Sequence, residues 1–315
     1  MALARLNSAE EWIARFGENR KPSVVTIGNF DGIHRGHQEI LRKVTQEARQ
    51  KNQLAAVLTL FPHPLKILRP AEAPALLMTI EQRLAAFEAE GIDAALVLPF
   101  NLELSKVRPE DFARRHLVET MRASRVLVGE NFRFGHRQEG NVESLENYGR
   151  QWGFEVESVK SLTIDGTVAS SSAIREALRD GRVEDARRML GRPFALSGEI
   201  QTGTGQGRKL VVPTLNLKTE QEMLPKQGVY ATETIAGGKS YRSVTNVGVR
   251  PTFNGSGVTV ETHLLGFNEN LDSGQMSVQF LKRLRDERKF SGVEELREQV
   301  LQDIESAKEF HRQQR

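Results

Sequence analysis

The fold of the first half of the chain is decided by the stretch V-V-T-I-G-N-F-D-G-I-H-R-G-H, which runs from Val24 to His37. Its β-branched beginning, Val24–Ile27, predicts a buried strand. The glycines, asparagine and aspartate that follow predict a tight turn. Beyond His37, apolar side chains recur at the spacing of one helix face, at Ile40, Leu41, Val44 and Ala48. The stretch is therefore expected to form a strand, a glycine-rich turn and the start of a helix.

The start of that helix is a candidate phosphate site. The first N–H groups of a helix lack backbone partners and carry a partial positive charge, so they attract anions. His34 and His37 are three residues apart, which places both imidazoles on one side of the first turn, where they can donate hydrogen bonds to phosphate oxygens. The alternative is an ordinary strand–helix turn with two surface histidines. The strand, the glycines and the helix around the pair favour the phosphate site.

Length and composition indicate a globular protein with more than one domain. A chain of 315 residues is long for a single core, and its 38% hydrophobic and 27% charged residues are typical of globular chains. A net charge of +3 gives no indication of nucleic-acid binding. The absence of cysteine excludes disulfides, thiolate metal sites and thiol catalysis. With no stretch of about 20 apolar residues and no secretory leader, we expect a cytoplasmic enzyme that spans no membrane.

Strands and helices alternate through the rest of the first half. We expect a helix over residues 1–22, closed by Gly17, ahead of the phosphate turn. After that turn, the expected strands are 54–60, 94–98, 125–128 and 154–159, and the expected helices are 80–89 and 109–121. Such alternation predicts an α/β domain with a Rossmann-like parallel sheet and helices on both of its faces.

Two loops of this predicted domain are candidates for ligand contact. Phe61-Pro62-His63-Pro64 and Gly129–Gly135 each follow a predicted strand, and ligands gather at the carboxyl edge of an open parallel sheet. The second loop holds Asn131 and Phe132, an amide and a ring that can hydrogen-bond to a flat ligand and stack on it. A rigid turn and an ordinary surface loop are the alternatives.

A serine run begins the next predicted helix. Ser170-Ser171-Ser172 is a favourable N-cap, and Arg175 follows in the first turn. An arginine at the positive end of a helix dipole is unfavourable on its own, but it suits a site where a phosphate is its partner. Together with the histidine pair, this segment is expected to form a second contact with the same nucleotide.

The second half has a different pattern, which begins after Gly191-Arg192-Pro193, where the proline ends a short charged helix. Short β-like segments follow with frequent turns and no helices between them, at 194–200, 214–218, 228–235, 241–247, 258–267 and 276–284. This pattern predicts an antiparallel β-barrel, and the amphipathic segment 293–310 predicts a terminal helix.

Three motifs of the predicted barrel carry polar groups suited to phosphoryl transfer. Gly203–Arg208 is a glycine-rich loop whose backbone can approach phosphates, although it lacks the ending of a P-loop. Thr214 and Asn216 project from one strand face, and their oxygens suit Mg²⁺. Glu261 lies in an apolar run, where an inward carboxylate is costly unless it is used, for example as a general base. Strand alternation equally allows Glu261 to face solvent.

These segments resemble the bacterial bifunctional riboflavin kinase/FAD synthetase family. In the first half the resemblance covers most of residues 20–180 and rests on Gly28–His37, Phe61–Pro64, Gly129–Gly135 and Ser170–Arg175. In the second half it rests on the glycine loop, Pro213–Asn216, Asn246–Phe253, Glu261–His263 and Arg283–Arg285. The resemblance implies an FMN adenylyltransferase domain over residues 1–184 and a riboflavin kinase domain over residues 185–315.

The resemblance also implies roles for individual residues. In the adenylyltransferase, His34, His37 and Arg175 would be catalytic. ATP would contact Gly28, Asn29, Phe30, Asp31, Gly36, Ser171 and Ser172, and flavin would contact Phe61, His63, Asn131 and Phe132. In the kinase, Glu261 would be the general base, with Arg285 near the flavin, Thr214 and Asn216 on Mg²⁺, and ATP at Gly203, Gly205, Gly207 and Arg208.

The function implied by the resemblance is the ATP-dependent conversion of riboflavin to FMN and of FMN to FAD, with Mg²⁺ as the metal cofactor. Expected partners are riboflavin, FMN, FAD and ATP, without nucleic acid or membrane, in a monomer or weak homo-oligomer. One alternative is another H-x-G-H nucleotidylyltransferase whose β-barrel only binds substrate. A second alternative is a flavin-binding or RNA-binding regulatory protein.

Overall fold

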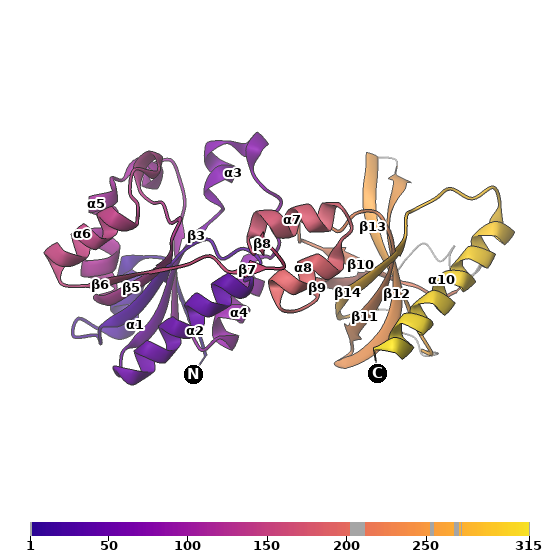
Figure 1. Ribbon diagram of the computed structural model, residues 1–315, viewed down its shortest axis with the longest axis horizontal. Helices are drawn as coiled ribbons and strands as arrows, with labels where there is room; N and C mark the ends of the chain where they lie inside the picture. Colours follow the sequence, from indigo (N-terminus) through magenta and orange to yellow (C-terminus); the bar gives the residue numbers. More distant parts are fainter. Residues whose placement is uncertain (1, 202–211, 253–254, 268–270, 272, 315) are drawn as a thin grey trace. The chain divides into compact units, whose positions relative to one another are not determined.

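The chain forms two compact units, Met1–Ser170 and Ser171–Arg315 (Figure 1). The computed structural model describes residues 2–201, 212–252, 255–267, 271 and 273–314. The domain boundary expected from the sequence lies between residues 184 and 185. It separates two expected activities, whereas the two units are defined by contacts between residues, so that boundary stays a prediction.

The first unit is built on a six-stranded sheet in the order β1-β4-β3-β2-β5-β6 (Figure 1). Every neighbouring pair in this sheet is parallel. The strands are β1 (Ala4–Leu6), β2 (Ser23–Ile27), β3 (Leu54–Phe61), β4 (Ala94–Pro99), β5 (Ala123–Gly129) and β6 (Glu155–Val159). The predicted parallel α/β fold is therefore confirmed, and the expected strands agree with the observed ones to within one or two residues at each end.

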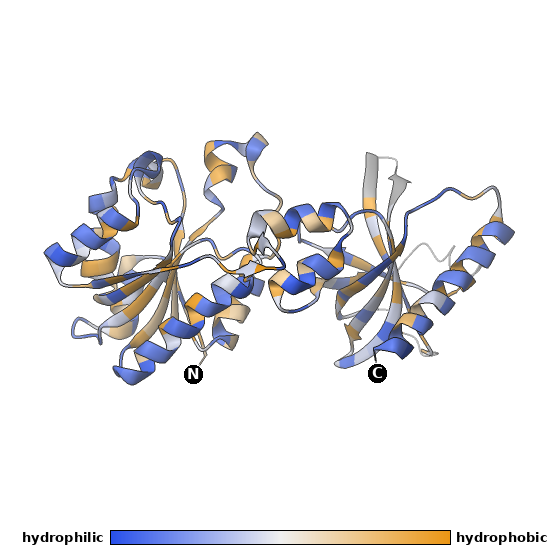
Figure 2. Ribbon diagram, viewed as in Figure 1, coloured by the Kyte–Doolittle hydropathy of each residue, from blue (hydrophilic) through white to orange (hydrophobic). Residues whose placement is uncertain are grey.

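Helices cover both faces of this sheet, because its strands are apolar on both sides (Figure 2). Val25 and Ile27 of β2 belong to the core under α1 (Ala9–Phe16), the π-helical segment η3 (Ala113–Thr120) and α6 (Val142–Trp152). Val24 belongs to the opposite core, under α2 (Arg35–Gln50) and α4 (Ile80–Ala89). Alternate residues of one strand thus enter opposite cores, as expected for a doubly covered parallel sheet.

Shorter elements lie between the main strands and helices of this unit. They are α3 (Pro64–Leu68), η1 (Pro70–Glu72), η2 (Leu104–Lys106), α5 (Pro109–Phe112), η4 (His136–Gln138), β7 (Thr163–Ile164) and β8 (Thr167–Val168). The helix expected over residues 109–121 is thus α5 continued by the π-helical segment η3. β7 and β8 pair with each other as a small hairpin.

The single helix expected over residues 1–22 is wrong. Ala4–Leu6 form strand β1, which pairs in parallel with β4 at the edge of the sheet. α1 begins only after Ser8, whose hydroxyl accepts a hydrogen bond from the Glu11 N–H and so caps the helix. Gly17 ends the helix, as predicted. The strand forms because a partner strand at the sheet edge outweighs the helical spacing of the local sequence.

The second unit contains a closed six-stranded barrel in the order β10-β13-β12-β11-β14-β9, in which β9 also pairs with β10. All of these pairings are antiparallel. The strands are β9 (Phe194–Gln201), β10 (Leu215–Thr219), β11 (Gly228–Ala236), β12 (Lys239–Thr252), β13 (Gly255–Leu264) and β14 (Gln275–Arg285). Helices α7 (Ser171–Arg179) and α8 (Val183–Leu190) precede the barrel, and α10 (Val293–Gln313) follows it. The predicted antiparallel barrel with a terminal helix is confirmed.

The barrel wall has a buried inner face and an outer face that α10 partly covers. Val260 and Thr262 of β13 are buried in the interior. A ladder of hydroxyl hydrogen bonds runs through that interior, among Thr232, Thr234, Ser243, Thr245 and Thr262. Outside, Ile304 of α10 packs with Ala231 and Val244. Within the described part of the chain, no helix combines the length and apolarity that crossing a bilayer requires.

Candidate active sites

Loops from three neighbouring strands meet at the carboxyl edge of the first unit's sheet. β2 lies between β3 and β5. After β2 the chain adds β3 and β4 on one side and then β5 and β6 on the other. Such a switch in strand order opens a crevice at the carboxyl ends of the strands. The loops that follow β2, β3 and β5 line one cavity there, with a volume of about 430 Å³. The ligand edge predicted from the sequence is therefore the edge that the fold opens.

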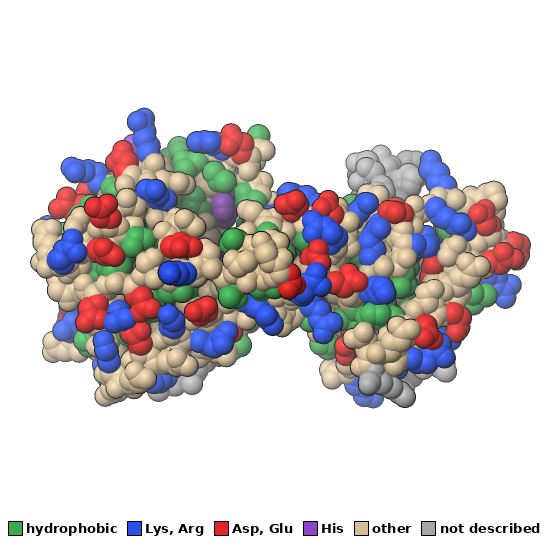
Figure 3. Space-filling view, viewed as in Figure 1, with side chains coloured by type: hydrophobic (Ala, Val, Ile, Leu, Met, Phe, Trp, Pro, Cys, Tyr) green, Lys and Arg blue, Asp and Glu red, His purple; other side chains and the backbone are tan. Residues whose placement is uncertain are grey.

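This cavity unites residues that the sequence assigned to nucleotide and to flavin. Gly28 and Asn29 come from the first loop, His63 from the second, and Asn131 and Phe132 from the third. The Asn29 Nδ2 atom lies 3.4 Å from the His63 Nε2 atom, so the first two loops are in direct contact. The remaining lining is mostly apolar, and a histidine is visible among apolar side chains in a hollow of this unit (Figure 3). An apolar pocket with a few convergent polar groups suits a flat aromatic ligand.

The histidine pair begins α2, as predicted. His34 is the N-cap residue and His37 lies in the first turn, and their rings stack with centroids 3.7 Å apart and planes 23° apart. Burial lowers the pKa of His34 to about 4. Burial, with a smaller contribution from His34, lowers the pKa of His37 well below its usual value. Both rings are therefore neutral at pH 7, and each has a buried Nδ1 atom without a hydrogen-bond partner among the described residues. Two such imidazoles can donate to phosphate oxygens, and an approaching polyphosphate favours their protonation.

Asp31 fastens the turn before the histidines to a distant segment. Its buried carboxylate accepts hydrogen bonds from the backbone N–H groups of Leu77 at 3.0 Å and Met78 at 3.1 Å. Gly36 allows the close approach of His34, whose ring would lie 3.3 Å from a Cβ atom at that position. These contacts fix the shape of the turn. The ATP contacts implied for Gly28, Asn29, Phe30, Asp31 and Gly36 stay predictions.

The positions of Phe61 and Arg83 differ from what the sequence indicates. Phe61, expected to contact flavin, is not among the described residues that line the cavity, and its ring lies 5.9 Å from the guanidinium carbon of Arg83. Its flavin contact stays a prediction. Arg83 lies on α4, is only 2% exposed, and donates from Nη1 to the carbonyl oxygen of Asn29 at 2.7 Å. Nothing in the local sequence signals this contact, since the two residues are 54 positions apart.

The serine run spans the boundary between the units: Ser170 ends the first unit, and Ser171, Ser172 and Arg175 belong to the second. Ser171 and Ser172 begin α7, in agreement with the predicted helix start, and Arg175 is buried within that helix. The Leu178 carbonyl of α7 accepts a hydrogen bond from the Lys226 N–H at 2.8 Å, which ties the helix to the barrel unit. The contact of this segment with the nucleotide of the histidine pair therefore stays a prediction.

On the barrel, three of the predicted kinase residues, Asn216, Glu261 and Arg285, lie in one row across five strands. Asn216 of β10 is directly paired with Glu261 of β13, and Glu261 with Asn246 of β12. Asn246 is paired in turn with Val229 of β11, and Val229 with Arg285 of β14. Directly paired residues of antiparallel strands project from the same face, about 5 Å apart. Because Val229 packs under α10, this row lies on the outer face, and Glu261 is half-buried there instead of facing the core. Asn246 was not assigned to the site from the sequence.

The segment that carries Thr214 is held against the strand of Glu261. The Nδ1 atom of His263 lies 2.8 Å from the Pro213 carbonyl oxygen, and His263 shares the face of Glu261, as alternation predicts. Thr214 immediately precedes β10. The described residues contain no group of three or more His, Cys, Asp and Glu side chains that could hold a metal ion. The predicted ATP residues Gly203, Gly205, Gly207 and Arg208 lie outside the described residues.

Arg285 is bound to the terminal helix. Its Nε and Nη2 atoms donate to the two carboxylate oxygens of Asp303 on α10, at 2.8 and 2.7 Å. The Asp303 side chain is 7% exposed and also accepts a hydrogen bond from Gln299 at 2.9 Å. This pair fastens α10 at the end of the row, and the flavin contact implied for Arg285 stays a prediction.

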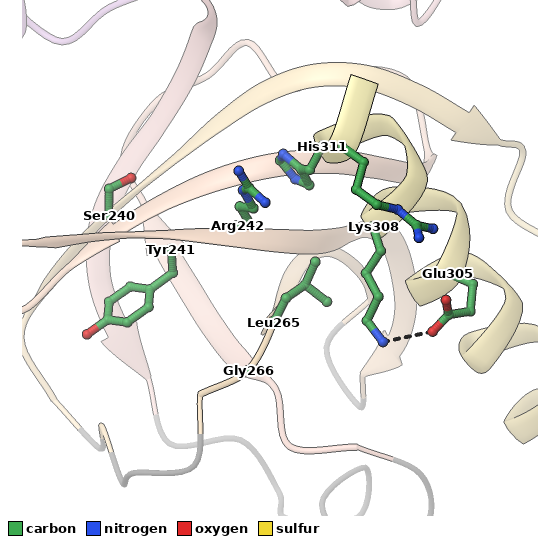
Figure 4. Close-up of a pocket in the computed structure, with 9 residues that line it drawn as sticks. Ser240, Tyr241, Arg242, Leu265, Gly266, Glu305, Lys308 and His311 are labelled. Atoms are coloured by element: carbon green, nitrogen blue, oxygen red, sulfur yellow. Dashed lines mark hydrogen bonds and ion pairs between the residues drawn. The ribbon is translucent and has the colours of Figure 1, made fainter. Parts of the chain in front are cut away.

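A second cavity of the barrel unit, about 510 Å³ in volume, lies where the end of α10 meets β12 and the end of β13 (Figure 4). Tyr241 and Arg242 of β12 line one side of it, and Lys308 and Glu305 of α10 line another. The Lys308 Nζ atom is 2.7 Å from a Glu305 carboxylate oxygen. None of the predicted site residues is in this lining. A groove of exposed, paired charges is typical of a protein surface and not of a substrate site.

Comparison with known proteins identifies both halves of the chain. The family model described as FAD synthetase matches residues 17–173, and the one described as riboflavin kinase matches residues 190–311. A crystal structure described as a macrolide-efflux protein from Streptococcus pneumoniae has a TM-score of 0.85 at 27% identity. That match covers 98% of this chain and 99% of the other.

Curated relatives with the name bifunctional riboflavin kinase/FMN adenylyltransferase match nearly the whole chain. The protein of Escherichia coli strain K12 is 35% identical over 288 residues, which are 91% of this chain and 92% of the relative. The protein of Haemophilus influenzae is 33% identical over 287 residues, with 91% and 93% coverage. The protein of Pseudomonas fluorescens is 36% identical over 286 residues, with 90% and 92% coverage. With both domains present and this identity along its length, the chain belongs to the bifunctional riboflavin kinase/FMN adenylyltransferase family.

Proposed function

We propose that the chain phosphorylates riboflavin to FMN in its second unit and adenylylates FMN to FAD in its first, using one ATP for each step. The observation that carries this proposal is the cavity beyond β2, where loops from three strands bring Asn29, His63 and Phe132 together. An aromatic and mostly apolar pocket beside a helix N-terminus suits a ligand with a flat ring at one end and a phosphate at the other. The substrates are those in the names of the relatives, riboflavin and FMN.

Adenylyl transfer in the first unit needs alignment and charge stabilisation more than covalent chemistry. A phosphate oxygen of FMN attacks the α-phosphorus of ATP, the new P–O bond forms, and the bond to the β-phosphate oxygen breaks, so that pyrophosphate leaves with the electron pair. FMN phosphate is already a nucleophile at neutral pH, so no general base is required. His34 and His37 would donate hydrogen bonds to the ATP phosphates as charge moves toward pyrophosphate. Ser171, Ser172 and Arg175 would hold the departing pyrophosphate.

Phosphoryl transfer in the second unit requires a base. The terminal ribityl hydroxyl of riboflavin attacks the γ-phosphorus of ATP, its proton passes to the Glu261 carboxylate, and ADP leaves. The half-buried position of Glu261 on the outer face, between Asn216 and Asn246, leaves its carboxylate accessible to a substrate. Two amides beside it can hold the reacting hydroxyl and phosphate in line.

Oxygen ligands for Mg²⁺ would come from Thr214 and Asn216. They offer a hydroxyl and an amide oxygen at the start of β10, and oxygen donors are what this hard cation prefers. Mg²⁺ takes few protein ligands and keeps water and substrate phosphates. When bound, it would neutralise phosphate charge during transfer. We further propose a cytoplasmic location and a monomer or weak homo-oligomer.

A product assay with two variants tests this division of labour. The protein is incubated with ATP and Mg²⁺ plus either riboflavin or FMN, and riboflavin, FMN and FAD are separated by chromatography. We expect His37→Ala to reduce FAD formation by about 10²–10³, the cost of one transition-state contact, while FMN formation stays unchanged. We expect Glu261→Ala to abolish FMN formation while FAD formation from supplied FMN stays unchanged.

The control for His37→Ala is His116→Leu, because His116 is a buried histidine of the first unit and burial lowers its pKa to about 4. It lies on η3 and is not itself among the described residues that line the cavity, although its ring contacts that of Phe112, which is, with centroids 4.9 Å apart. His116→Leu should leave both activities unchanged. The proposal is contradicted if a folded His37→Ala or Glu261→Ala variant loses both activities together.

A further inference from the structure

The Arg83 guanidinium is buried with most of its hydrogen-bonding capacity unused. The residue is 2% exposed, and its Nη1 atom donates to the Asn29 carbonyl at 2.7 Å. Its Nε and Nη2 atoms are buried without a hydrogen-bond partner among the described residues. Burial lowers the pKa of Arg83, and the Asp31 carboxylate nearby partly offsets this shift. A buried charge with so few bonds is costly, so its presence calls for an explanation in function.

Among the described residues, the Arg83 guanidinium has one hydrogen-bond partner, Asn29, which lies at the junction of two binding elements. Asn29 belongs to the turn that leads into the histidine pair, and it also lines the cavity beyond β2. Its side-chain amide faces His63 from the β3 loop at 3.4 Å. The next residue, Phe30, has a φ of +50°, in the left-handed region that a non-glycine residue rarely adopts. A turn with such backbone strain needs contacts that hold it.

The same guanidinium also contacts the base of the second loop. Its central carbon lies 5.9 Å from the centroid of the Phe61 ring, at the distance of a cation–π contact. Phe61 ends β3 and precedes His63, which lines the cavity. Arg83 therefore lies behind both loops and joins the turn after β2 to the loop after β3.

We propose that Arg83 is a positioning residue for adenylyl transfer, which holds the Asn29 turn in the conformation that binds ATP. It does so through the Asn29 carbonyl and through the Phe61 ring, and it touches neither ATP nor FMN. Its unused positive charge lies behind the turn that would receive the polyphosphate, where it favours binding of an anion. This inference rests on the proposed role of the His34–His37 turn in ATP binding.

A positioning role makes a kinetic prediction that a stabilising role does not make. Without Arg83 the turn would occupy its binding conformation only part of the time, and apparent affinity falls by that fraction. Once ATP is bound, the turn is held and the chemical step is unchanged. KM for ATP should therefore rise while kcat stays nearly constant. A loss of fold stability alone would reduce the amount of active protein and leave KM unchanged.

The test measures FAD formation from FMN at varied ATP in Arg83→Met, Arg83→Lys and Arg20→Met. Arg20 is the matched control, because it is also buried in the first unit and donates to backbone carbonyls, among them that of Thr120 at 2.7 Å. Stability of the first unit is followed by tryptophan fluorescence, since both tryptophans, Trp12 and Trp152, belong to it. Riboflavin kinase activity of the second unit reports the concentration of intact protein.

We expect Arg83→Met to raise KM for ATP about tenfold with kcat within about twofold, as for the loss of one bond to a charged group. Arg83→Lys keeps a charge and a donor and should restore most of the affinity. Arg20→Met should lower stability without changing KM. If Arg83→Met does not fold, a rise of about threefold in the KM of Arg83→Lys supports the proposal.

Two results would overturn the proposal. One is an unchanged KM in folded Arg83→Met, or in Arg83→Lys where Arg83→Met does not fold. The other is a fall in kcat with KM unchanged, which would place Arg83 in the transition state. Failure of the underlying site assignment would look different, because His37→Ala would then keep full FAD formation whatever the Arg83 variants do.

Discussion

The ion pair between Arg285 and Asp303 allows a quantitative prediction about the terminal helix. Asp303→Asn removes the negative charge and one acceptor from a bidentate pair whose bonds are 2.8 and 2.7 Å long. A hydrogen bond to a charged group contributes about 1.5–3 kcal/mol net. Arg285 keeps 22% side-chain exposure, so water can partly replace the lost partner. We therefore expect α10 to lose about 2 kcal/mol of its stability against local opening.

Hydrogen–deuterium exchange measured by peptide mass spectrometry checks this value. A loss of about 2 kcal/mol corresponds to roughly thirtyfold faster exchange of the protected amides of α10. Peptides from the first unit serve as an internal standard and should be unchanged. The control is Lys308→Gln, which breaks the Lys308–Glu305 pair on the same helix, where the side chains are 48% and 66% exposed. Because an exposed pair contributes little, its effect should be less than about threefold.

Unchanged α10 exchange in Asp303→Asn would refute this reasoning. It would mean that the ion pair does not hold the helix and that Arg285 is available for another partner. In that case Asp303→Asn would also leave the barrel's kinase activity unaltered, and a direct flavin contact of Arg285 would become the better explanation of its place in the row.

Two further predictions concern the first unit, and both are measured by urea unfolding with tryptophan fluorescence. Burial lowers the pKa of His116 from 6.5 to about 4, so between these pH values the unfolded chain binds a proton that the folded chain does not, and the free energy of unfolding falls as pH falls below 6.5. His116→Leu should therefore remove about 2 kcal/mol of the difference in unfolding free energy between pH 7.5 and pH 5. An unchanged difference would contradict the lowered pKa of His116. Gly135→Ala should cost about 2–3 kcal/mol and raise KM for FMN, because φ is +72° and a Cβ atom would lie 2.7 Å from Pro109 beside the cavity. Gly153→Ala has a similar φ of +82° with no atom within 4 Å, so it should cost only about 1 kcal/mol, and equal costs would exclude the steric explanation.

Much of the fold follows from local sequence patterns. The buried strands of the first unit are β-branched or aliphatic runs bounded by turn residues, and such runs have few alternatives in a chain of this composition. Local sequence does not indicate strand β1, because Ala4–Leu6 fit the helical spacing of the residues after them. Its strand conformation depends on pairing with β4, about 90 positions away in the register of Ala4 with Ala94, and a local pattern cannot report such a partner.

In the candidate sites, too, features set by local spacing are predictable from the sequence, whereas contacts between residues far apart in the chain are not. The stacked histidines and the cavity loops follow from spacing and from strand ends, so the sequence predicts them. The buried position of Arg83 depends on the Asn29 carbonyl, and the role of Asp31 depends on the N–H groups of Leu77 and Met78. The pairing of Glu261 with both Asn216 and Asn246 depends on the barrel register, which the sequence alone leaves open.

A strand in the wall of a closed barrel cannot change its length freely. If one residue were deleted from β13 ahead of Glu261, the carboxylate would take the inward position of Val260, opposite Val247, and Thr262 would turn outward. Loss of two residues would restore the facing but shift the carboxylate along the wall, away from Asn216 and Asn246. Evolution of the kinase half is therefore expected to vary the hairpin turns and the side chains of this barrel, while the number of residues between a turn and Glu261 stays fixed.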